Sequence, residues 1–165
     1  MKNSFTLSKI DDINLKKFNI VLKNYKKDIK ALVEKVLANK KLFKSKIFSP
    51  DISKVRFDVS FCNDETIRQI NKDYRDKDSS TDVITFSLFY DDKDSIIYRK
   101  TADLGQIIVS IETADKQKEK NNNDLRKEIL TLICHGILHL IGFDHLTKKD
   151  YDFVVDIQNE ILKDF

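Results

Sequence analysis

Residues 124–145 read DLRKEILTLICHGILHLIGFDH and contain all three histidines of the chain. On a helix, His135 and His139 share one face, about 6 Å apart along the axis. Gly142 is placed to end that helix in a left-handed turn, so the chain that follows can bring His145 back as a third ligand. Three imidazoles leave one position of a tetrahedral zinc ion open for water, as catalytic sites require. The spacing therefore predicts one metal ion per chain, held by His135, His139 and His145. Zn²⁺ is the expected ion, although the same three imidazoles would also accept Ni²⁺, Co²⁺ or Cu²⁺.

The helix that carries the first two histidines, which we place at residues 124–141, is apolar on nearly every face. Its apolar positions are Leu125, Ile129, Leu132, Ile133, Ile137, Leu140 and Ile141. A helix of this kind belongs in the centre of a domain. A lone histidine there would more often be a hydrogen-bonded core residue than a ligand. Two in-register histidines followed by a third favour a metal site.

Strands and helices alternate along the remaining sequence. Apolar periodicity and capping residues predict helices at 25–44, from Asn63 to Tyr74, at 112–120 and after Thr147. Alternating and apolar runs predict strands at 55–62, 82–86 and 104–111, with an exposed loop or hairpin at 91–101. We therefore expect an α+β fold (mixed α/β) with a small mixed β-sheet packed against helices, formed by a single domain at residues 1–165.

Composition indicates a globular protein. Hydrophobic residues make up 41% of the chain and charged residues 35%, which excludes a disordered chain. The N-terminus has no apolar segment of the secretory type, and the longest apolar stretch, 129–143, is too short to span a bilayer. Cys62 and Cys134 have no metal-type spacing and are expected to be buried, reduced thiols. These features predict a cytoplasmic protein with no membrane partner.

Charge is distributed unevenly. Residues 1–56 hold 15 Lys and Arg against 5 Asp and Glu, a net charge of +10, whereas residues 57–165 hold 15 against 22, a net charge of −7. A basic segment of this size can follow a polyanion such as RNA. The alternative is that the lysines reflect coding bias and merely solvate the surface. Composition favours neither.

The histidine spacing matches the H-x-x-x-H-x-x-G-x-x-H pattern of metzincin peptidases with one difference. The position of their catalytic glutamate is Gly136 here. Glycine has no proton acceptor, so peptide hydrolysis by that mechanism is not expected.

The histidine block closely resembles the signature of the YbeY family, the bacterial zinc-dependent endoribonucleases of ribosomal RNA maturation. Two further blocks are similar to that family: Ile70–Arg75 followed by Thr81–Phe86, and Leu104–Ile107. In the last block, Gln106 replaces the acid of the family. Ser79-Ser80 and Ser87-Leu88 also stand where many members carry Lys-Pro and Pro.

The resemblance implies a zincin-like histidine helix and a single-strand-specific, metal-dependent endoribonuclease. It also implies a role in ribosomal RNA processing, namely 3′-end maturation of the small-subunit RNA, and in ribosome quality control. The implied partners are ribosomal RNA and the ribosome or small-subunit assembly proteins. The implied catalytic residues are Arg75, His135, His139 and His145.

Arg75 also has a physical rationale, because a guanidinium can clamp a phosphate with two hydrogen bonds and offset charge in the transition state. A residue at this place could equally be an exposed salt-bridge partner at a helix end. Asp82 and Asp144 are candidates to orient ligand imidazoles through the second ring nitrogen, and both could instead cap turns.

Two other functions remain open. A metal hydrolase of another class, such as a metallopeptidase, would prefer casein to RNA. A non-catalytic ribosome assembly factor with a structural metal would bind RNA without metal-dependent turnover.

Overall fold

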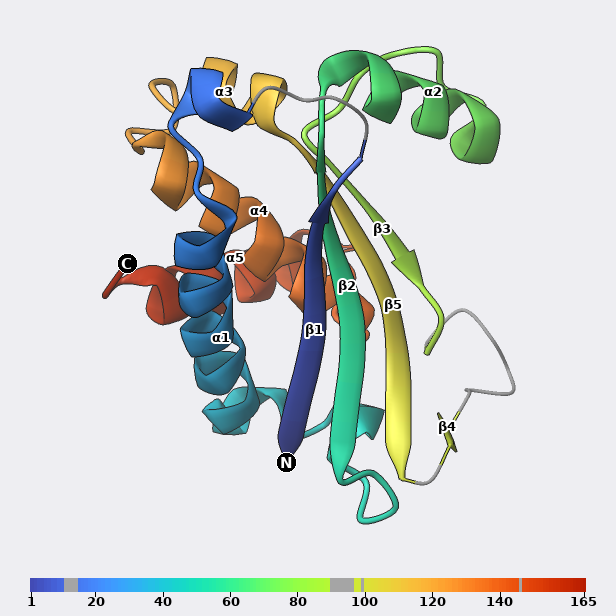
Figure 1. The fold of residues 1–165 in the computed structure, drawn as a ribbon. Coiled ribbons are helices and arrows are strands. Elements are labelled where there is room, and N and C mark those ends of the chain that lie inside the picture. The colour runs from blue at the N-terminus through green and yellow to red at the C-terminus, as the bar shows by residue number, and fades with distance from the viewer. Residues whose placement is uncertain (11–14, 90–96, 99, 146) are drawn as a thin grey trace.

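The computed structural model describes residues 1–10, 15–89, 97–98, 100–145 and 147–165. Within this part of the chain, one mixed sheet has helices on both sides (Figure 1). The strands are β1 (Lys2–Lys9), β2 (Lys54–Cys62), β3 (Val83–Ser87), β4 (Ile97–Tyr98) and β5 (Thr101–Ser110). The helices are α1 (Leu22–Ala38), α2 (Asp64–Arg75), α3 (Ile111–Gln117), α4 (Leu125–Leu140) and α5 (Lys148–Leu162), with short 3₁₀ turns η1 (Leu15–Phe18), η2 (Lys40–Leu42) and η3 (Lys46–Phe48).

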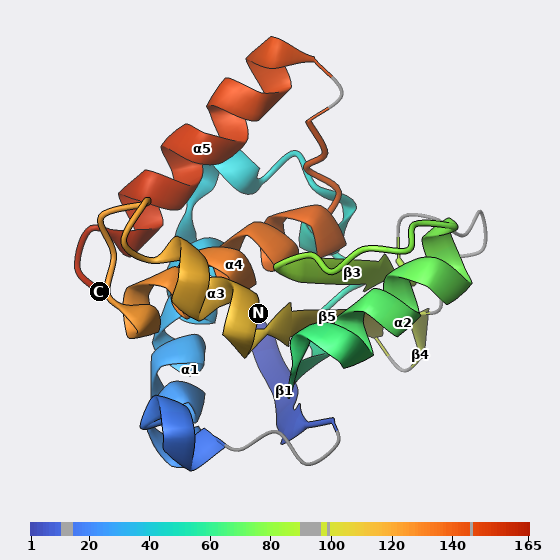
Figure 2. The same ribbon diagram turned by 90° about the horizontal axis from the view of Figure 1, so that it is seen from above.

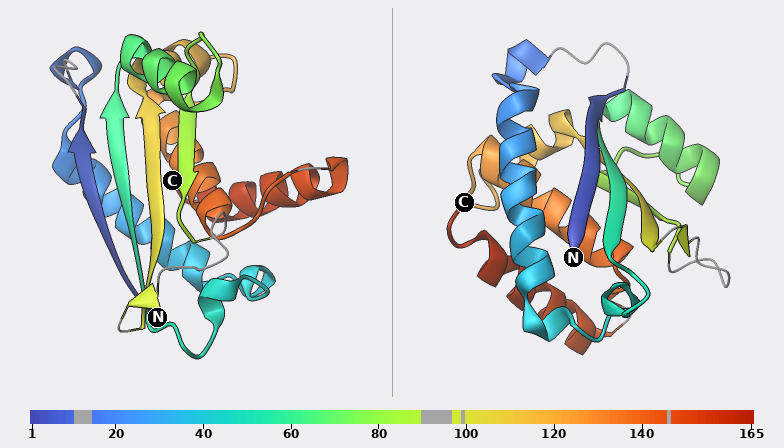
Figure 3. Two further views of the ribbon diagram at one scale, coloured as in Figure 1. Left: turned by 90° about the vertical axis from the view of Figure 1, so that its right-hand side faces the viewer. Right: turned by 60° about the horizontal axis from the view of Figure 1, so that its bottom comes forward.

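The sheet has the strand order β1-β2-β5-β3, with β4 paired to β5. Strands β1, β2 and β5 run parallel, and β3 runs antiparallel beside β5 (Figure 3). Helices α1, α4 and α5 lie on one side of the sheet, and α2 lies on the other (Figure 2). The predicted α+β fold with a small mixed sheet is confirmed.

Helix α4 is the centre of the hydrophobic core, as its sequence predicts. It packs on β3 and β5 and is also in contact with α1, α3 and α5. Its buried residues are Glu128, Ile129, Leu130, Leu132, Ile133, Cys134, Gly136, Ile137, Leu138 and Leu140. The one charged member, Glu128, accepts hydrogen bonds from Asn121 and Asn123, at 2.8 and 2.7 Å. A buried carboxylate is tolerated here because both oxygens have donors.

Several boundaries agree with the sequence. The Asn63 side chain caps α2 by accepting from the Thr66 N–H, and Thr147 caps α5 in a capping box with Asp150. Strand β2 covers the predicted range 55–62. The two thiols, Cys62 and Cys134, are free and buried as expected.

Other boundaries differ. The helix predicted at 25–44 ends at Ala38, because Asn39 is extended and its side chain accepts from the Lys41 N–H, which starts a 3₁₀ turn instead. Strand β5 begins at Thr101, before the expected 104. The hairpin expected at 91–101 falls largely on residues 90–96 and 99, which lie outside the described residues. Strand β1 was not predicted.

No helix in the described ranges is both long and apolar enough to cross a membrane.

Candidate metal centre

The last turns of α4 and the loop after it hold the three histidines. The turn at Gly142 has a φ of +89°, a conformation that suits glycine. The Gly142 N–H donates to the His139 carbonyl and the Phe143 N–H to the Leu138 carbonyl, both at 2.9 Å. This pair of bonds is a Schellman motif, and it turns the chain back toward the helix so that His145 reaches the other two.

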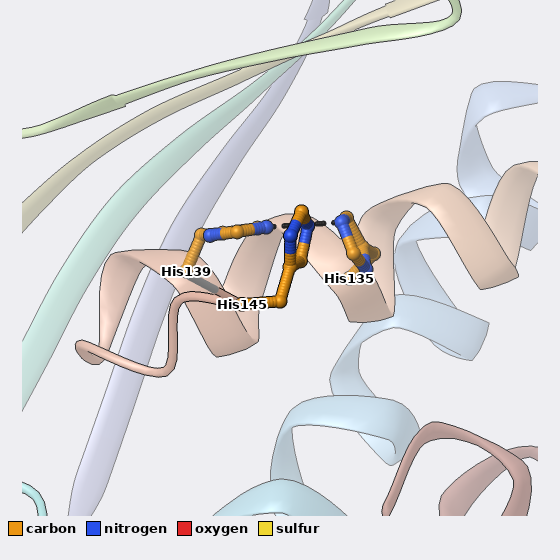
Figure 4. A group of neighbouring side chains, drawn as sticks. All are labelled: His135, His139 and His145. Carbon is orange, nitrogen blue, oxygen red and sulfur yellow. Dashed lines mark hydrogen bonds between the residues drawn. The ribbon is translucent and has the colours of Figure 1, made fainter. Parts of the chain in front are cut away.

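The three predicted ligands converge on one point (Figure 4). The Nε2 atoms of His135 and His139 lie 2.9 Å apart. One nitrogen from each of the three rings lies within 4.8 Å of the others. Two nitrogen ligands of a tetrahedral zinc ion, each at about 2.0–2.1 Å, lie about 3.3 Å apart. The spacing of these rings therefore suits a shared metal ion.

Burial and neighbouring charges keep the imidazoles of His135 and His139 neutral, which is the form that binds metal. Burial, reinforced by the neighbouring His145, lowers the pKa of His135. Burial, reinforced by His135, lowers the pKa of His139 to about 4. Both imidazoles are therefore neutral at physiological pH, and only a neutral imidazole can donate a lone pair to a cation. The donor set fits a borderline metal such as Zn²⁺.

The histidines lie in a cleft of about 620 Å³. Its walls come from the end of α2, from β3 with the residue preceding it, from α4 and from the loop after α4. The lining residues are Arg75, Asp82, Val83, Thr85, Ser87, His135, His139, Gly142, Asp144 and His145. A cleft of this size admits a segment of a polymer as well as a small molecule.

Arg75 lies on the wall of this cleft, as the last residue of α2. Its Nη2 donates to the Thr85 carbonyl of β3 at 3.2 Å, which aligns the guanidinium along that strand. The helix stops there because Asp76 is left-handed, with a φ of 55°. The positive charge of Arg75 also contributes to the lowered pKa of His139, so the two groups interact electrostatically across the cleft.

A family model for the endoribonuclease YbeY matches residues 12–165. The chain belongs to the YbeY family. Its relatives include endoribonucleases YbeY of Prochlorococcus marinus (strain MIT 9211), 40% identical over 64% of this chain and 56% of that protein, and of Sulfurihydrogenibium sp. (strain YO3AOP1), 36% identical over 82% and 80%. The chain thus spans just over half of the first relative and most of the second.

A Thermotoga maritima protein solved in solution shares the fold. Its structure superposes with a TM-score of 0.53 and 22% sequence identity, over 98% of this chain and 91% of that one. The YbeY resemblance that the histidine block indicated is confirmed by the family model and by these relatives.

Asp82 and Asp144, the two acids predicted as candidates to orient ligand imidazoles, both lie near the histidines. An oxygen of Asp144 lies 3.6 Å from the Nδ1 of His139 and accepts the His145 N–H at 2.7 Å. Asp82 likewise accepts from the following backbone N–H, that of Val83, at 2.8 Å, and also from the Thr81 hydroxyl, and its negative charge partly offsets the lowered pKa of His135. Asp144 therefore lies beside His139 and Asp82 acts on His135 through its charge, so both acids line the cleft as candidates to orient a ligand imidazole.

Gln106, which replaces the acid of the YbeY family, does not line the cleft. Its amide donates to the Ser60 hydroxyl at 3.1 Å, and it borders a separate hollow beside Tyr74 and Phe86. Gln106 therefore contributes no atom to the lining of the histidine cleft.

Sequence reasoning missed two neighbours of the histidines, both on α5. Gln158 partly offsets the lowering of the pKa of His135 that burial causes. The Tyr151 ring lies edge-on to His145, with centroids 5.7 Å apart. Nothing in the local sequence marks either residue, because only the packing of α5 brings them close to the histidines.

Proposed function

We propose that this chain is a metal-dependent endoribonuclease that cleaves single-stranded RNA, with Zn²⁺ held by His135, His139 and His145. The single observation that carries the metal is the convergence of three ring nitrogens within 4.8 Å in an open cleft. Membership of the endoribonuclease YbeY family supports RNA as the substrate.

Each side chain of the cleft has a task in this proposal. The three imidazoles hold the ion, and Asp144 keeps the ring of His139 in place. When bound, the ion supplies Lewis acidity and activates water for hydrolysis. Arg75 binds the phosphate of the RNA backbone through the guanidinium N–H groups that do not reach Thr85, and it offsets charge that develops on the phosphate oxygens.

The packing around Gly136 argues against the peptidase alternative. A Cβ atom built there would lie 2.8 Å from the Cγ2 of Ile107 in β5. The glutamate that metzincins carry at this position would have to displace that buried side chain. The cleft therefore holds a metal and a phosphate-binding group without the base that peptide hydrolysis by the metzincin route requires.

The biological role is part of the same proposal. The YbeY resemblance supports ribosomal RNA processing at the 3′ end of the small-subunit RNA and ribosome quality control. Partners would be ribosomal RNA and the ribosome or small-subunit assembly proteins, and the compartment would be the cytoplasm.

One experiment separates the endoribonuclease from the two alternatives. The protein is incubated with single-stranded fragments of ribosomal RNA and with casein, first as purified, then with a chelator, and then after zinc is restored. We expect RNA cleavage that the chelator abolishes and zinc restores. Casein cleavage would identify a peptidase, and RNA binding without cleavage would identify an assembly factor.

A further inference from the structure

Residues 39–49, between α1 and β2, combine aromatic and basic side chains. This 39–49 segment reads NKKLFKSKIFS, with four lysines, two phenylalanines and no acidic residue. Proteins that bind single-stranded nucleic acid without sequence preference combine a positive surface with aromatic side chains on which bases stack. The composition of the segment matches both requirements.

The 39–49 segment is held in a defined conformation. Leu42 and Ile47 are completely buried, and Ser45 is buried as well. The Ser45 hydroxyl donates to the Ile141 carbonyl at 2.6 Å. The Asn39 and Ser45 side chains also cap the turns η2 and η3. Because these residues anchor the segment, the side chains between them project from a fixed backbone.

Phe43 is one of these projecting side chains. It is 51% exposed, although it has a buried residue on its N-terminal side. Its ring contacts Phe48, with centroids 4.7 Å apart and planes at 42°. Phe48 thus supports the Phe43 ring from one side, and about half of Phe43 stays open to solvent. A pre-ordered, exposed ring loses little entropy when a base stacks on it.

The lysines beside Phe43 carry charge that RNA can use. Within the described ranges, Lys41 forms an ion pair with Glu160 at 2.7 Å, whereas Lys40 forms none. The Lys44 ammonium lies 5.2 Å from the ring centre of Phe143 and 4.8 Å from that of Phe153. These rings position the ammonium without neutralising it, because an aromatic face carries no net charge.

The 39–49 segment also lies against the loop that completes the metal centre. Ile141, which accepts the Ser45 hydroxyl, directly precedes the Gly142 turn. Phe143, under the Lys44 ammonium, is two residues before His145. In the left view of Figure 3, the teal segment passes beside the loop that joins α4 to α5. A single strand of RNA that enters the cleft can therefore continue onto this segment.

We propose that the 39–49 segment binds single-stranded RNA next to the cleavage site. One base stacks on Phe43, and Lys40 and Lys44 contact the phosphates on either side. The proposal rests on the endoribonuclease function, and it adds a binding surface outside the cleft. Stacking needs an unpaired base, so this surface also favours single strands over duplexes.

The test compares Phe43→Ala with Phe43→Trp. Affinity is measured by fluorescence anisotropy with a labelled single-stranded RNA of about 12 nucleotides and with a duplex of the same length, in chelator so that neither is cut. We expect Phe43→Ala to weaken single-strand binding about tenfold, which equals about 1.4 kcal/mol, and Phe43→Trp to keep it. Duplex affinity should not change. In the metal-loaded enzyme, Phe43→Ala should raise KM and leave kcat at saturating RNA unchanged.

Val21→Ala is the matched control, because Val21 is 55% exposed and lies at the opposite end of α1. Equal single-strand affinity of the parent and Phe43→Ala would overturn this proposal and leave the endoribonuclease intact. If Phe43→Ala instead abolished association between copies of the chain and left the RNA affinity unchanged, Phe43 would serve a protein contact. That result would also overturn the proposal. A parent that neither binds nor cleaves single-stranded RNA would instead contradict the proposed function itself.

Discussion

At the scale of single residues, the three histidines are not equivalent. His135 and His139 are half-buried and fixed by α4, whereas His145 is exposed and depends on the Gly142 turn. We expect the double variant His135→Ala, His139→Ala to lose near-stoichiometric metal and His145→Ala to bind it more weakly. Elemental analysis of protein purified without a histidine tag measures both. Zinc binding by the double variant as tight as that of the parent would exclude this site.

The lowered pKa values give a pH prediction for the metal-free protein. Burial holds the pKa of His139 at about 4 in the folded state, against 6.5 for an unperturbed histidine. As the pH falls from about 6.5 toward 4, the unfolded chain takes up a proton that the folded chain does not. As far as it depends on His139, the free energy of unfolding is therefore highest above about pH 6.5 and decreases as the pH falls toward 4.

His139→Gln removes this contribution, so its stability should fall less steeply over the same pH range. Denaturant titrations of both proteins at several pH values in chelator give the comparison. Carboxylates titrate similarly in the two proteins, so the difference isolates His139. Parallel curves would contradict the buried, neutral state of this ring.

Arg75 carries the phosphate-binding part of the proposal. Arg75→Ala should keep the fold and the metal, because the side chain is exposed and, within the described part of the chain, makes one hydrogen bond, to β3. It should lose most RNA cleavage. Arg75→Lys should restore only part of it, because an ammonium lacks the planar fork that binds two phosphate oxygens. Gel assays of RNA cleavage with metal-loaded protein measure this, and parent-like turnover by Arg75→Ala would place the residue outside the reaction.

Residue-scale prediction from the sequence works where the chemistry is local. His135, His139 and His145 lie within eleven consecutive residues, so helical geometry and one glycine are enough to bring them together. Gln158 acts on His135 only because α5 packs against α4. Asp82 and Asp144 are indistinguishable in sequence, and only the fold shows that Asp144 lies beside the Nδ1 of His139.

At the scale of elements, the same distinction between local and long-range contacts explains where the predicted ends of helices and strands were wrong. Helix α4 is predicted well because a long apolar run with a glycine at its end has few alternatives. Helix α1 is predicted to end six residues too late because Phe43 continues its apolar period, while the side-chain cap at Asn39 diverts the backbone. Strand β1 was missed because it contributes only Phe5 and Leu7 to the core, and its pairing with β2 uses backbone groups that any sequence supplies.

The contact of α4 with β5 gives a prediction of its own. Gly136 faces Ile107 so closely that a Cβ would lie 2.8 Å from its Cγ2. Gly136→Ala gains about 1 kcal/mol of helix propensity but overpacks a buried contact, which costs about 1–3 kcal/mol. We therefore expect a net loss of stability of about 1 kcal/mol.

Ile107→Ala supplies the control, because it removes the atoms with which the new Cβ would clash. In that background, Gly136→Ala should be stabilising. Urea denaturation of the four proteins of this double-mutant cycle measures the sign in each background. The same sign in both would show that Ile107 does not set the spacing of helix and sheet.

At the scale of the whole molecule, the cleft exists because one sheet brings distant segments together. Arg75 of α2 approaches the histidines of α4 only because β3, between them in sequence, pairs antiparallel with β5 beneath α4. The order of elements along the chain predicts a mixed sheet but not which strands are neighbours. For that reason the sequence indicates the histidines by geometry and Arg75 only by resemblance.

The last prediction concerns the basic N-terminal third. Lys23, Lys26, Lys27 and Lys30 are exposed on α1 at the helical spacing i, i+3, i+4 and i+7, so they form one stripe. Like charges at these spacings destabilise a helix in isolation, and a bound polyanion would relieve the repulsion. If RNA follows this stripe, changing Lys23, Lys26 and Lys30 to Glu should weaken single-strand binding. It should also reduce the slope of log affinity against log salt by about 2, because about 0.7 is lost per phosphate contact on single strands.

The stripe contributes no residue to the cleft, so metal content and kcat at saturating RNA should stay as in the parent. Changing the same three lysines to Arg keeps the charge and should keep both affinity and slope. The measurement is a titration of single-stranded RNA at several salt concentrations with all three proteins in parallel. An unchanged slope in the Glu variant would mean that these lysines only solvate α1. RNA binding would then depend on the 39–49 segment and the cleft.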